Sequence, residues 1–229
     1  MKVYVYVEGP SDRIALEALW YDWRQKLRGN SSAIHVIDLD NKSKYFRKIG
    51  SRASEKLMAN QNDLVVGLLD FYPNNSYRGT DYAHDNFTEL ISLQNRLVNQ
   101  CLSAKGANPN EVARLMSRFH ASALKHDLEM LLLAACDQLR EHLGTDEQLD
   151  NWRHPVEDQN QNNPPKRVVE ELYRNKKHCK YRDTKDAAAV LIKVSNMGAM
   201  LNSQSGQLQC PVFKEMLDWI GAKTGVPAY

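Results

Sequence analysis

The sequence Met-Lys-Val-Tyr-Val-Tyr-Val-Glu-Gly-Pro-Ser-Asp, residues 1–12, contains the clearest structural signal in this 229-residue chain. Residues Val3 to Val7 are all β-branched or aromatic, which favours a buried strand over a helix. Glu8 follows at the expected end of the strand, Gly9 permits a tight reversal, and Pro10 is typical of the first turn of a helix. The stretch therefore predicts a strand, an acid at its carboxyl end, and a helix.

A second apolar run ends in the same way. Residues Leu64 to Leu69 are followed directly by Asp70. Two parallel buried strands would place Glu8 and Asp70 side by side on the sheet edge where α/β proteins bind ligands. The alternative is that Glu8 is a solvated residue in an ordinary strand-to-helix turn.

The order of predicted elements indicates an α/β fold with a mostly parallel, Rossmann-like sheet flanked by helices. We expect residues 1–145 to form this core and residues 146–229 to form a helical and loop elaboration. Two further strands are predicted at Ala33–Ile37 and Phe119–Leu124, and the main predicted helices cover Ile14–Leu27, a segment from Ser51, a segment from about Asp85, Lys125–Leu143 and Pro211–Ile220.

The composition is that of an ordinary water-soluble protein. Hydrophobic residues make up 42% of the chain, charged residues 25%, and the formal net charge is +2. We expect no signal peptide and no membrane span, because no apolar run is long enough. The four cysteines are far apart and form no Cys-x-x-Cys pair, which favours a reducing, cytoplasmic location over a disulfide framework or a zinc site.

Carboxylates at neighbouring strand ends suggest a metal-dependent reaction. Hard divalent cations such as Mg²⁺ or Mn²⁺ prefer carboxylates and water, and phosphoryl-transfer enzymes use them. Glu8 and Asp70 are the first two candidate ligands, and Glu129 is the candidate third. An acid at position 129 is also favoured by the dipole of the helix predicted there, which is the structural alternative.

A basic stretch in the second half of the chain could neutralise the phosphates of a nucleic acid. It could equally be a solvated surface or one that contacts an ATPase. The candidate nucleic-acid-binding residues are Lys166, Arg167, Arg174, Lys176, Lys177, Lys180, Arg182 and Lys185.

Two motifs resemble those of TOPRIM domains, the fold shared by topoisomerases, DnaG-type primases and overcoming-lysogenisation-defect nucleases. Val7–Asp12, Val-Glu-Gly-Pro-Ser-Asp, is similar to their glutamate motif, and Leu68–Tyr72, Leu-Leu-Asp-Phe-Tyr, to their aspartate motif. The segments Lys125–Leu132, Pro164–Arg167 and Cys210–Phe213 resemble a bacterial family of TOPRIM-like proteins of unknown function, which are often encoded beside ABC or SMC-like ATPases in apparent phage-defence loci.

The resemblance implies a TOPRIM-like fold, nuclease activity and roles for individual residues. Glu8 would be the general acid/base or metal-facing glutamate, and Asp70 the first metal-binding aspartate. Glu129 would be the acid of a His-Glu-Phe-Glu-like segment that begins at His126, and Lys166 joins these three acids in the candidate catalytic set. The sequence departs from the Asp-x-Asp pattern at Tyr72, so Glu129 or another acid must replace the second aspartate, or catalysis is lost.

The leading hypothesis is therefore a Mg²⁺-dependent TOPRIM-type nuclease that acts with an ATPase partner in phage defence. The main alternative is a non-catalytic TOPRIM-like subunit that binds nucleic acid or a nucleotide and regulates the ATPase. A plain α/β domain with chance motifs is the third reading. The sequence leaves open whether the substrate is DNA or RNA, and it is compatible with a homo-oligomer without establishing one.

Overall fold

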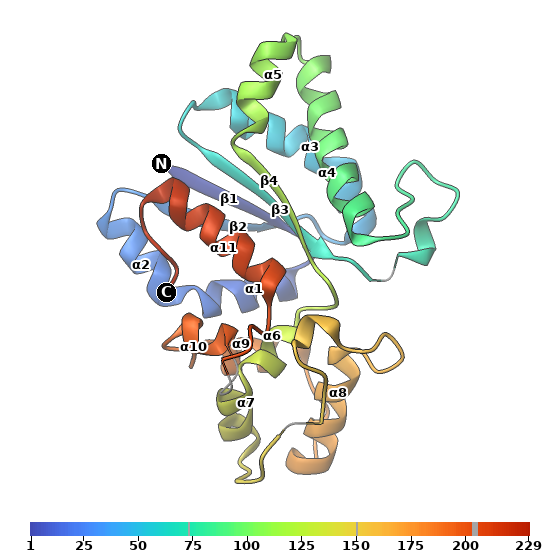
Figure 1. Cartoon of the computed structure of the whole chain (residues 1–229), viewed down its shortest axis with the longest axis vertical. Coiled ribbons are helices and arrows are strands. Elements are labelled where there is room, and N and C mark those ends of the chain that lie inside the picture. The colour runs from blue at the N-terminus through green and yellow to red at the C-terminus, as the bar shows by residue number, and fades with distance from the viewer. Residues whose placement is uncertain (73, 150, 203–205) are drawn as a thin grey trace. The chain divides into compact units, whose positions relative to one another are not determined.

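A four-stranded sheet is built from the segments that the sequence predicts to be strands (Figure 1). The computed structural model describes residues 1–72, 74–149, 151–202 and 206–229. The strands run in the spatial order β2-β1-β3-β4. Helices flank this parallel sheet, which confirms the predicted α/β, Rossmann-like architecture. The strands are β1 (Lys2–Val7), β2 (Ala33–Asp38), β3 (Leu64–Asp70) and β4 (Phe119–Leu124).

Strand β1 lies between β2 and β3 and pairs in parallel with both. Its register with β2 runs from Lys2 opposite Ala33 to Val7 opposite Asp38, and its register with β3 aligns Val3 with Leu64. Every residue of β3 before Asp70 is buried. A strand covered on both faces needs a continuous apolar run rather than an alternating one, and this explains the sequence of β3.

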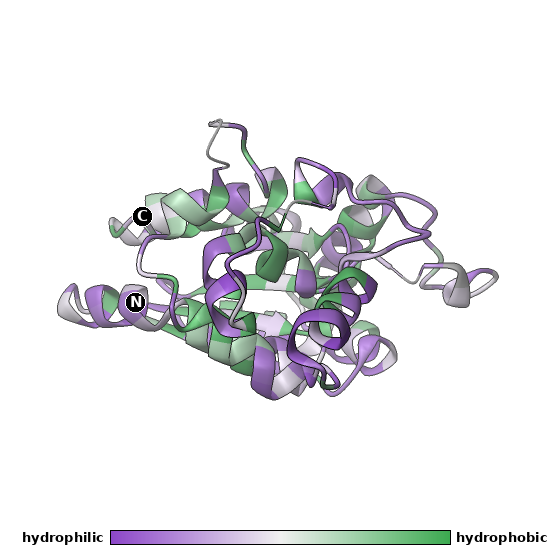
Figure 2. Cartoon of the chain, turned by 90° about the horizontal axis from the view of Figure 1, so that it is seen from below, coloured by the Kyte–Doolittle hydropathy of each residue, from purple (hydrophilic) through white to green (hydrophobic). Residues whose placement is uncertain are grey.

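The chain divides into two compact units. The first comprises residues 1–13 and 27–123, and the second comprises residues 14–26 and 124–229. The division therefore differs from the expected one after residue 145, because residues 14–26 and 124–145 belong to the second unit. Both hydrophilic and hydrophobic residues occur along the helices (Figure 2), as expected of helices with one buried face.

The helices are divided between the two units. The first unit contains α3 (Lys42–Ala59), α4 (Phe87–Ala104) and α5 (Pro109–Met116). Helices α1 (Pro10–Leu19) and α2 (Tyr21–Gly29) each have residues in both units. The second unit contains α6 (Glu129–Ala134), α7 (Cys136–Leu143), α8 (Pro165–Leu172), α9 (Asp183–Leu191), α10 (Met197–Leu201) and α11 (Pro211–Thr224). Three short turns are η1 (Asn75–Tyr77), η2 (Val156–Asp158) and η3 (Tyr173–Lys177). None of the helices in the described residues combines the length and apolar character needed to cross a membrane.

Three predicted helices have different bounds in the structure. The helix expected at Ile14–Leu27 is two helices that meet at Trp20. The helix expected from Ser51 starts at Lys42 instead, because the side chain of Asn41 accepts a hydrogen bond from the amide of Lys44 and caps it. The spacing of the polar residues in the sequence did not indicate that Asn41 caps a helix here.

The predicted helix Lys125–Leu143 is also wrong as a single element. It begins only at Glu129 and is interrupted at Ala135, whose φ of −82° and ψ of 44° are not helical. The side chain of Lys125 is held by Asp158 at 2.9 Å, and Asp127 accepts a hydrogen bond from the backbone of Lys166. Apolar residues recur at helical spacing through the whole segment, but these tertiary contacts determine the structure of its first residues instead.

A buried polar chain lies beside Gly67 in the first unit. The hydroxyl of Tyr45 donates to Gln94 Oε1 at 2.6 Å, and Gln94 Nε2 donates to the carbonyl of Ser122 at 3.0 Å. A Cβ atom on Gly67 would lie 2.4 Å from both the Tyr45 hydroxyl and Gln94 Oε1. Glycine at position 67 therefore leaves the space in which these two buried side chains meet.

We predict that Gly67→Ala destabilises the protein by about 1–3 kcal/mol, because the methyl group overpacks the core and separates Tyr45 from Gln94. Gly29→Ala is the matched control, since a Cβ there meets nothing within 4 Å. Urea unfolding of both variants measures the difference. Equal stability of the two variants would contradict this account of the core.

The N-terminus of α11 is capped by a glutamate from a distant turn. Glu157 is 1% exposed, and its carboxylate accepts hydrogen bonds from the amides of Val212 and Phe213 at 3.0–3.1 Å. Burial is the largest influence on this carboxyl and raises its pKa above 4.5, although the two amides act in the opposite direction. A raised pKa in the folded state means that ionisation of Glu157 costs stability as pH rises through that pKa.

We predict that Glu157→Gln becomes more stable relative to the wild type as pH rises from about 4 to 7, because the amide keeps an acceptor oxygen and carries no charge. Glu157→Ala removes the cap and should cost about 1 kcal/mol or more. Unfolding free energies measured across this pH range test both statements. A difference between Gln and Glu that does not change with pH would refute the electrostatic part.

Candidate functional site

The order of the strands reverses beside β1, and this creates a topological switch point. From β1 the chain moves to β2 on one side, and β3 then lies on the other side of β1. In open parallel sheets, ligands bind at the carboxyl ends of the two strands where the order reverses. Glu8 follows β1 directly, and Asp70 is the last residue of β3. The structure therefore brings these two predicted site residues to the switch point of the sheet.

Lys42 accompanies the two acids, and sequence reasoning missed it. It is the first residue of α3, it is 5% exposed, and its Nζ donates to the carbonyl of Phe71 at 2.8 Å. The carboxylates of Glu8 and Asp70 both act on its charge. We call Glu8, Lys42 and Asp70 the sheet-edge cluster. A lysine is rarely buried to this extent unless negative charge surrounds it.

Burial controls the ionisation of this cluster. Desolvation lowers the pKa of Lys42 to about 8, although Glu8 and Asp70 act to raise it. Desolvation also raises the pKa of Glu8, with the charge and backbone amide of Lys42 opposing the change. The cluster holds two carboxylates against one ammonium, so its formal charge remains negative.

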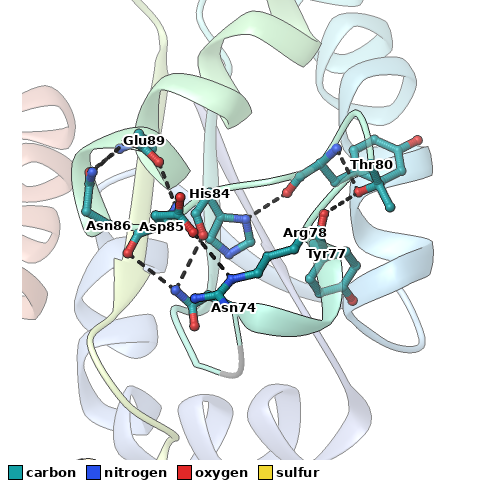
Figure 3. A network of polar contacts seen from close by, with 9 residues as sticks. Asn74, Tyr77, Arg78, Thr80, His84, Asp85, Asn86 and Glu89 are labelled. Carbon is teal, nitrogen blue, oxygen red and sulfur yellow. Dashed lines mark hydrogen bonds and ion pairs between the residues drawn. The ribbon is translucent and has the colours of Figure 1, made fainter.

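A folded loop leads away from Asp70 toward α4 (Figure 3). The side-chain amide of Asn74 donates to the carbonyls of His84 and Asp85, and His84 Nδ1 lies 2.8 Å from the carbonyl of Tyr82. His84 is 2% exposed, and burial lowers its pKa. These contacts join Asn74 to the residues just before α4.

The two acids at the carboxyl end of β2, Asp38 and Asp40, form ion pairs with basic side chains. Asp38 accepts from Arg13 Nε at 2.9 Å, and Asp40 lies 2.7 Å from Lys48 Nζ. Asp40 is exposed, and its pKa is lowered chiefly by the hydrogen bond from Lys48. We therefore assign these acids to ion pairs and leave Glu8 and Asp70 as the candidate ligand-binding acids of the sheet edge.

The second unit holds another group of acids around a lysine. The Nζ of Lys166 lies 2.5 Å from Asp183 Oδ2, and the amide of Lys166 donates to Asp127 Oδ2 at 3.3 Å. Glu129 is 4% exposed and lies within electrostatic reach of Lys166. We call Asp127, Glu129, Lys166 and Asp183 the second-unit cluster. It brings together two predicted catalytic residues, Glu129 and Lys166.

Desolvation also has the largest effect on the pKa values of Asp127 and Glu129 in the second-unit cluster. Burial and the neighbouring Glu129 raise the pKa of Asp127 to about 7, and burial raises that of Glu129 against the effect of Lys166. Burial and then the Glu129 carboxylate raise the pKa of Tyr181. Because Glu129 belongs to the second unit, its convergence with Glu8 and Asp70 stays a prediction.

Several side chains of the predicted basic stretch already have partners. Arg167 pairs with Glu171, Lys176 with Glu147, and Arg182 with Asp186. Lys177 Nζ contacts His142 Nε2 at 2.8 Å. The remaining predicted cations, Arg174, Lys180 and Lys185, are exposed. Because exposed ion pairs are weak, these pairs do not exclude nucleic-acid binding by the basic stretch. The nucleic-acid surface stays a prediction.

Glu8 and Asp70 form a pair of acids at the sheet edge. In the part of the chain that the structure describes, no three His, Cys, Asp or Glu side chains gather closely enough to hold a metal ion. Mg²⁺ commonly uses only one or two protein carboxylates and keeps several waters. Glu8 and Asp70 fit that mode of binding.

Comparisons with known proteins identify a family but no characterised relative. No curated protein and no solved structure matches the chain. A family model described as a domain of unknown function, DUF4276, matches residues 7–221. The matched region includes Glu8, Lys42, Asp70 and the whole second-unit cluster. The chain therefore belongs to the DUF4276 family.

Proposed function

We propose that this protein is a magnesium- or manganese-dependent nuclease that hydrolyses phosphodiester bonds of DNA or RNA. The observation that carries the proposal is the position of Glu8 and Asp70 at the carboxyl ends of adjacent parallel strands, where the strand order reverses. The resemblance of the surrounding motifs to TOPRIM domains supports the same reaction class.

The chemistry of the donor atoms fits a hard divalent cation. Glu8 and Asp70 supply carboxylate oxygens, and the excess of negative charge in the sheet-edge cluster attracts a cation. A bound ion would provide Lewis-acid activation of a phosphodiester. The residues proposed to hold it are Glu8 and Asp70, with Glu129 as the third acid predicted from the sequence.

Lys42 supplies the positive charge that a phosphate needs. Its ammonium lies at the start of α3, within reach of both acids and in a place where burial strengthens electrostatic interactions. A phosphodiester carries negative charge that increases on attack, and a fixed cation stabilises it. We assign Lys42 to the scissile phosphate, and we assign the exposed Arg174, Lys180 and Lys185 to the more distant nucleic-acid backbone.

The proposed biological setting is phage defence with an ABC or SMC-like ATPase partner. This part of the proposal rests on the resemblance of Lys125–Leu132, Pro164–Arg167 and Cys210–Phe213 to proteins encoded beside such ATPases. Lys166 would act within the second-unit cluster, where it holds Asp183 and faces Glu129.

A second candidate function is a non-catalytic module that binds the phosphates of a nucleic acid or nucleotide and regulates the ATPase. Lys42 favours it, because a buried ammonium already offsets part of the charge of Glu8 and Asp70 without a metal. Tyr72 also favours it, since its aromatic ring packs against Phe71 at 4.4 Å between centroids where a second aspartate was expected.

We predict that Glu8→Gln and Asp70→Asn each reduce Mn²⁺-dependent cleavage by about 10²-fold or more, because each removes a charged ligand while keeping the side-chain shape. Asp40→Asn is the matched control, since this acid is exposed and bound to Lys48. Cleavage of single-stranded and duplex DNA and of RNA by the purified chain measures the effect. Undiminished cleavage by both variants would exclude the sheet edge as the active site.

We predict that Lys42→Met abolishes cleavage but leaves Mn²⁺ binding at least as tight as in the wild type, because the ammonium serves the phosphate and competes with the metal. Calorimetric titration with Mn²⁺ provides this readout independently of activity. If Mn²⁺ binds neither the wild type nor Lys42→Met, the non-catalytic module becomes the better description.

A further inference from the structure

The segment between β3 and α4 supplies several aromatic side chains to the first unit. Tyr72, Tyr77 and Tyr82 are each partly buried and pack against the hydrophobic core of that unit. A partly buried ring rests on the protein and keeps some of its surface in contact with solvent. We call the described residues 71–72 and 74–86 the tyrosine loop.

Tyr77 joins the tyrosine loop to the sheet-edge cluster. The Nζ of Lys42 lies 5.8 Å from the centroid of the Tyr77 ring, and the Tyr77 hydroxyl is 3.2 Å from Ser43 Oγ. Lys42 and Ser43 are the first two residues of α3. The loop therefore lies against the end of the helix that supplies Lys42 to the candidate site.

Tyr82 rests flat on a neighbouring ring. Its ring is nearly parallel to that of Phe46, with 5.2 Å between the centroids and 11° between the planes. Phe46 is 2% exposed, so it gives Tyr82 a fixed support, and Tyr77 contacts the same phenylalanine edge-to-face. Stacking on Phe46 uses one face of the Tyr82 ring. An aromatic side chain held in this way is the kind of support on which nucleobases stack.

Hydrogen bonds hold the backbone of the loop on both sides of Tyr82 (Figure 3). The hydroxyl of Thr80 accepts from the amide of Tyr82 at 3.2 Å, and the carbonyl of Tyr82 lies 2.8 Å from His84 Nδ1. Arg96 Nη2 donates to the carbonyl of Asp81 at 2.8 Å. A ring whose backbone is already positioned loses little conformational freedom when it binds a ligand.

Two arginines add positive charge around Tyr77. Arg78 follows it directly, its side chain is 73% exposed, and its ion pair with Asp85 is long at 3.8 Å. Arg47 lies one helical turn after Ser43 on α3 and is also exposed. Because exposed ion pairs contribute little, both guanidinium groups can bind phosphates.

We propose that the tyrosine loop binds unpaired bases and makes single-stranded nucleic acid the preferred substrate of the sheet-edge site. This specificity rests on the proposed nuclease function. Tyr82 stacks on a base, Arg47 and Arg78 neutralise phosphates, and Lys42 takes the scissile phosphate. Inside a duplex, neighbouring bases cover both faces of each base, so only an unpaired base has a face for Tyr82.

Fluorescence anisotropy with the full chain and no added metal measures binding without cleavage. The probe is a labelled mixed-sequence strand of about 15 nucleotides, as DNA and as RNA, compared with the DNA duplex of the same sequence. Tyr82→Leu keeps an apolar contact with Phe46 and should weaken single-strand binding about tenfold, whereas Tyr82→Phe keeps the ring and should bind as the wild type does. Tyr21→Leu, at an exposed tyrosine of α2, is the matched control. Duplex affinity should be the same in all of these proteins.

The arginine and the kinetics provide two further readouts. Arg78→Gln should reduce the slope of log affinity for the single strand against log salt concentration by about 0.7, because one phosphate contact is lost. In the presence of Mn²⁺, Tyr82→Leu should raise KM for single-strand cleavage and leave kcat unchanged, since the tyrosine binds substrate without taking part in the reaction.

Two results would overturn the specificity. One is duplex binding by the wild type as tight as its single-strand binding. The other is the same single-strand affinity in Tyr82→Leu and Tyr82→Phe, whether unchanged or weakened. Failure of the nuclease proposal gives a different result, namely single-strand binding that depends on the Tyr82 ring but no cleavage in Mn²⁺.

Discussion

The parallel pairing of β1 with strands on both sides is the constraint from which the candidate site follows. The chain places β2 on one side of β1 and β3 on the other, and both registers are continuous. Parallel neighbours must end at the same edge, so the residues that follow β1 and terminate β3 meet there. A one-residue slip of β3 would exchange which of its side chains face each side of the sheet.

The charges at the sheet edge depend on one another. Lys42 is buried, and a buried ammonium is tolerable only beside negative charge. Glu8 and Asp70 provide that charge, while the capping of α3 by Asn41 places Lys42 where it reaches both. The geometry of the candidate site is thus also part of what positions the first turn of α3, and removing either acid has consequences for both.

The sequence predicts well whatever depends on a local pattern. Continuous apolar runs located β1 and β3, and the acids at the ends of these runs located Glu8 and Asp70. The burial of Lys42 was not predictable, because position 42 lies in a polar, basic stretch and becomes buried only through contacts with Phe71 and the two acids. The break at Ala135 was missed for a similar reason, since apolar residues keep a helical period through it.

The two clusters differ in their place in the fold, and this difference decides where the metal proposal is placed. In the second-unit cluster, burial raises the pKa of both Asp127 and Glu129, and the ammonium of Lys166 is already paired with Asp183. Burial raises the pKa of Glu8 at the sheet edge too, but Glu8 and Asp70 adjoin the switch point of a parallel sheet, where ligands bind in open α/β folds. We therefore place the metal proposal at the sheet edge and give Glu129 a supporting role.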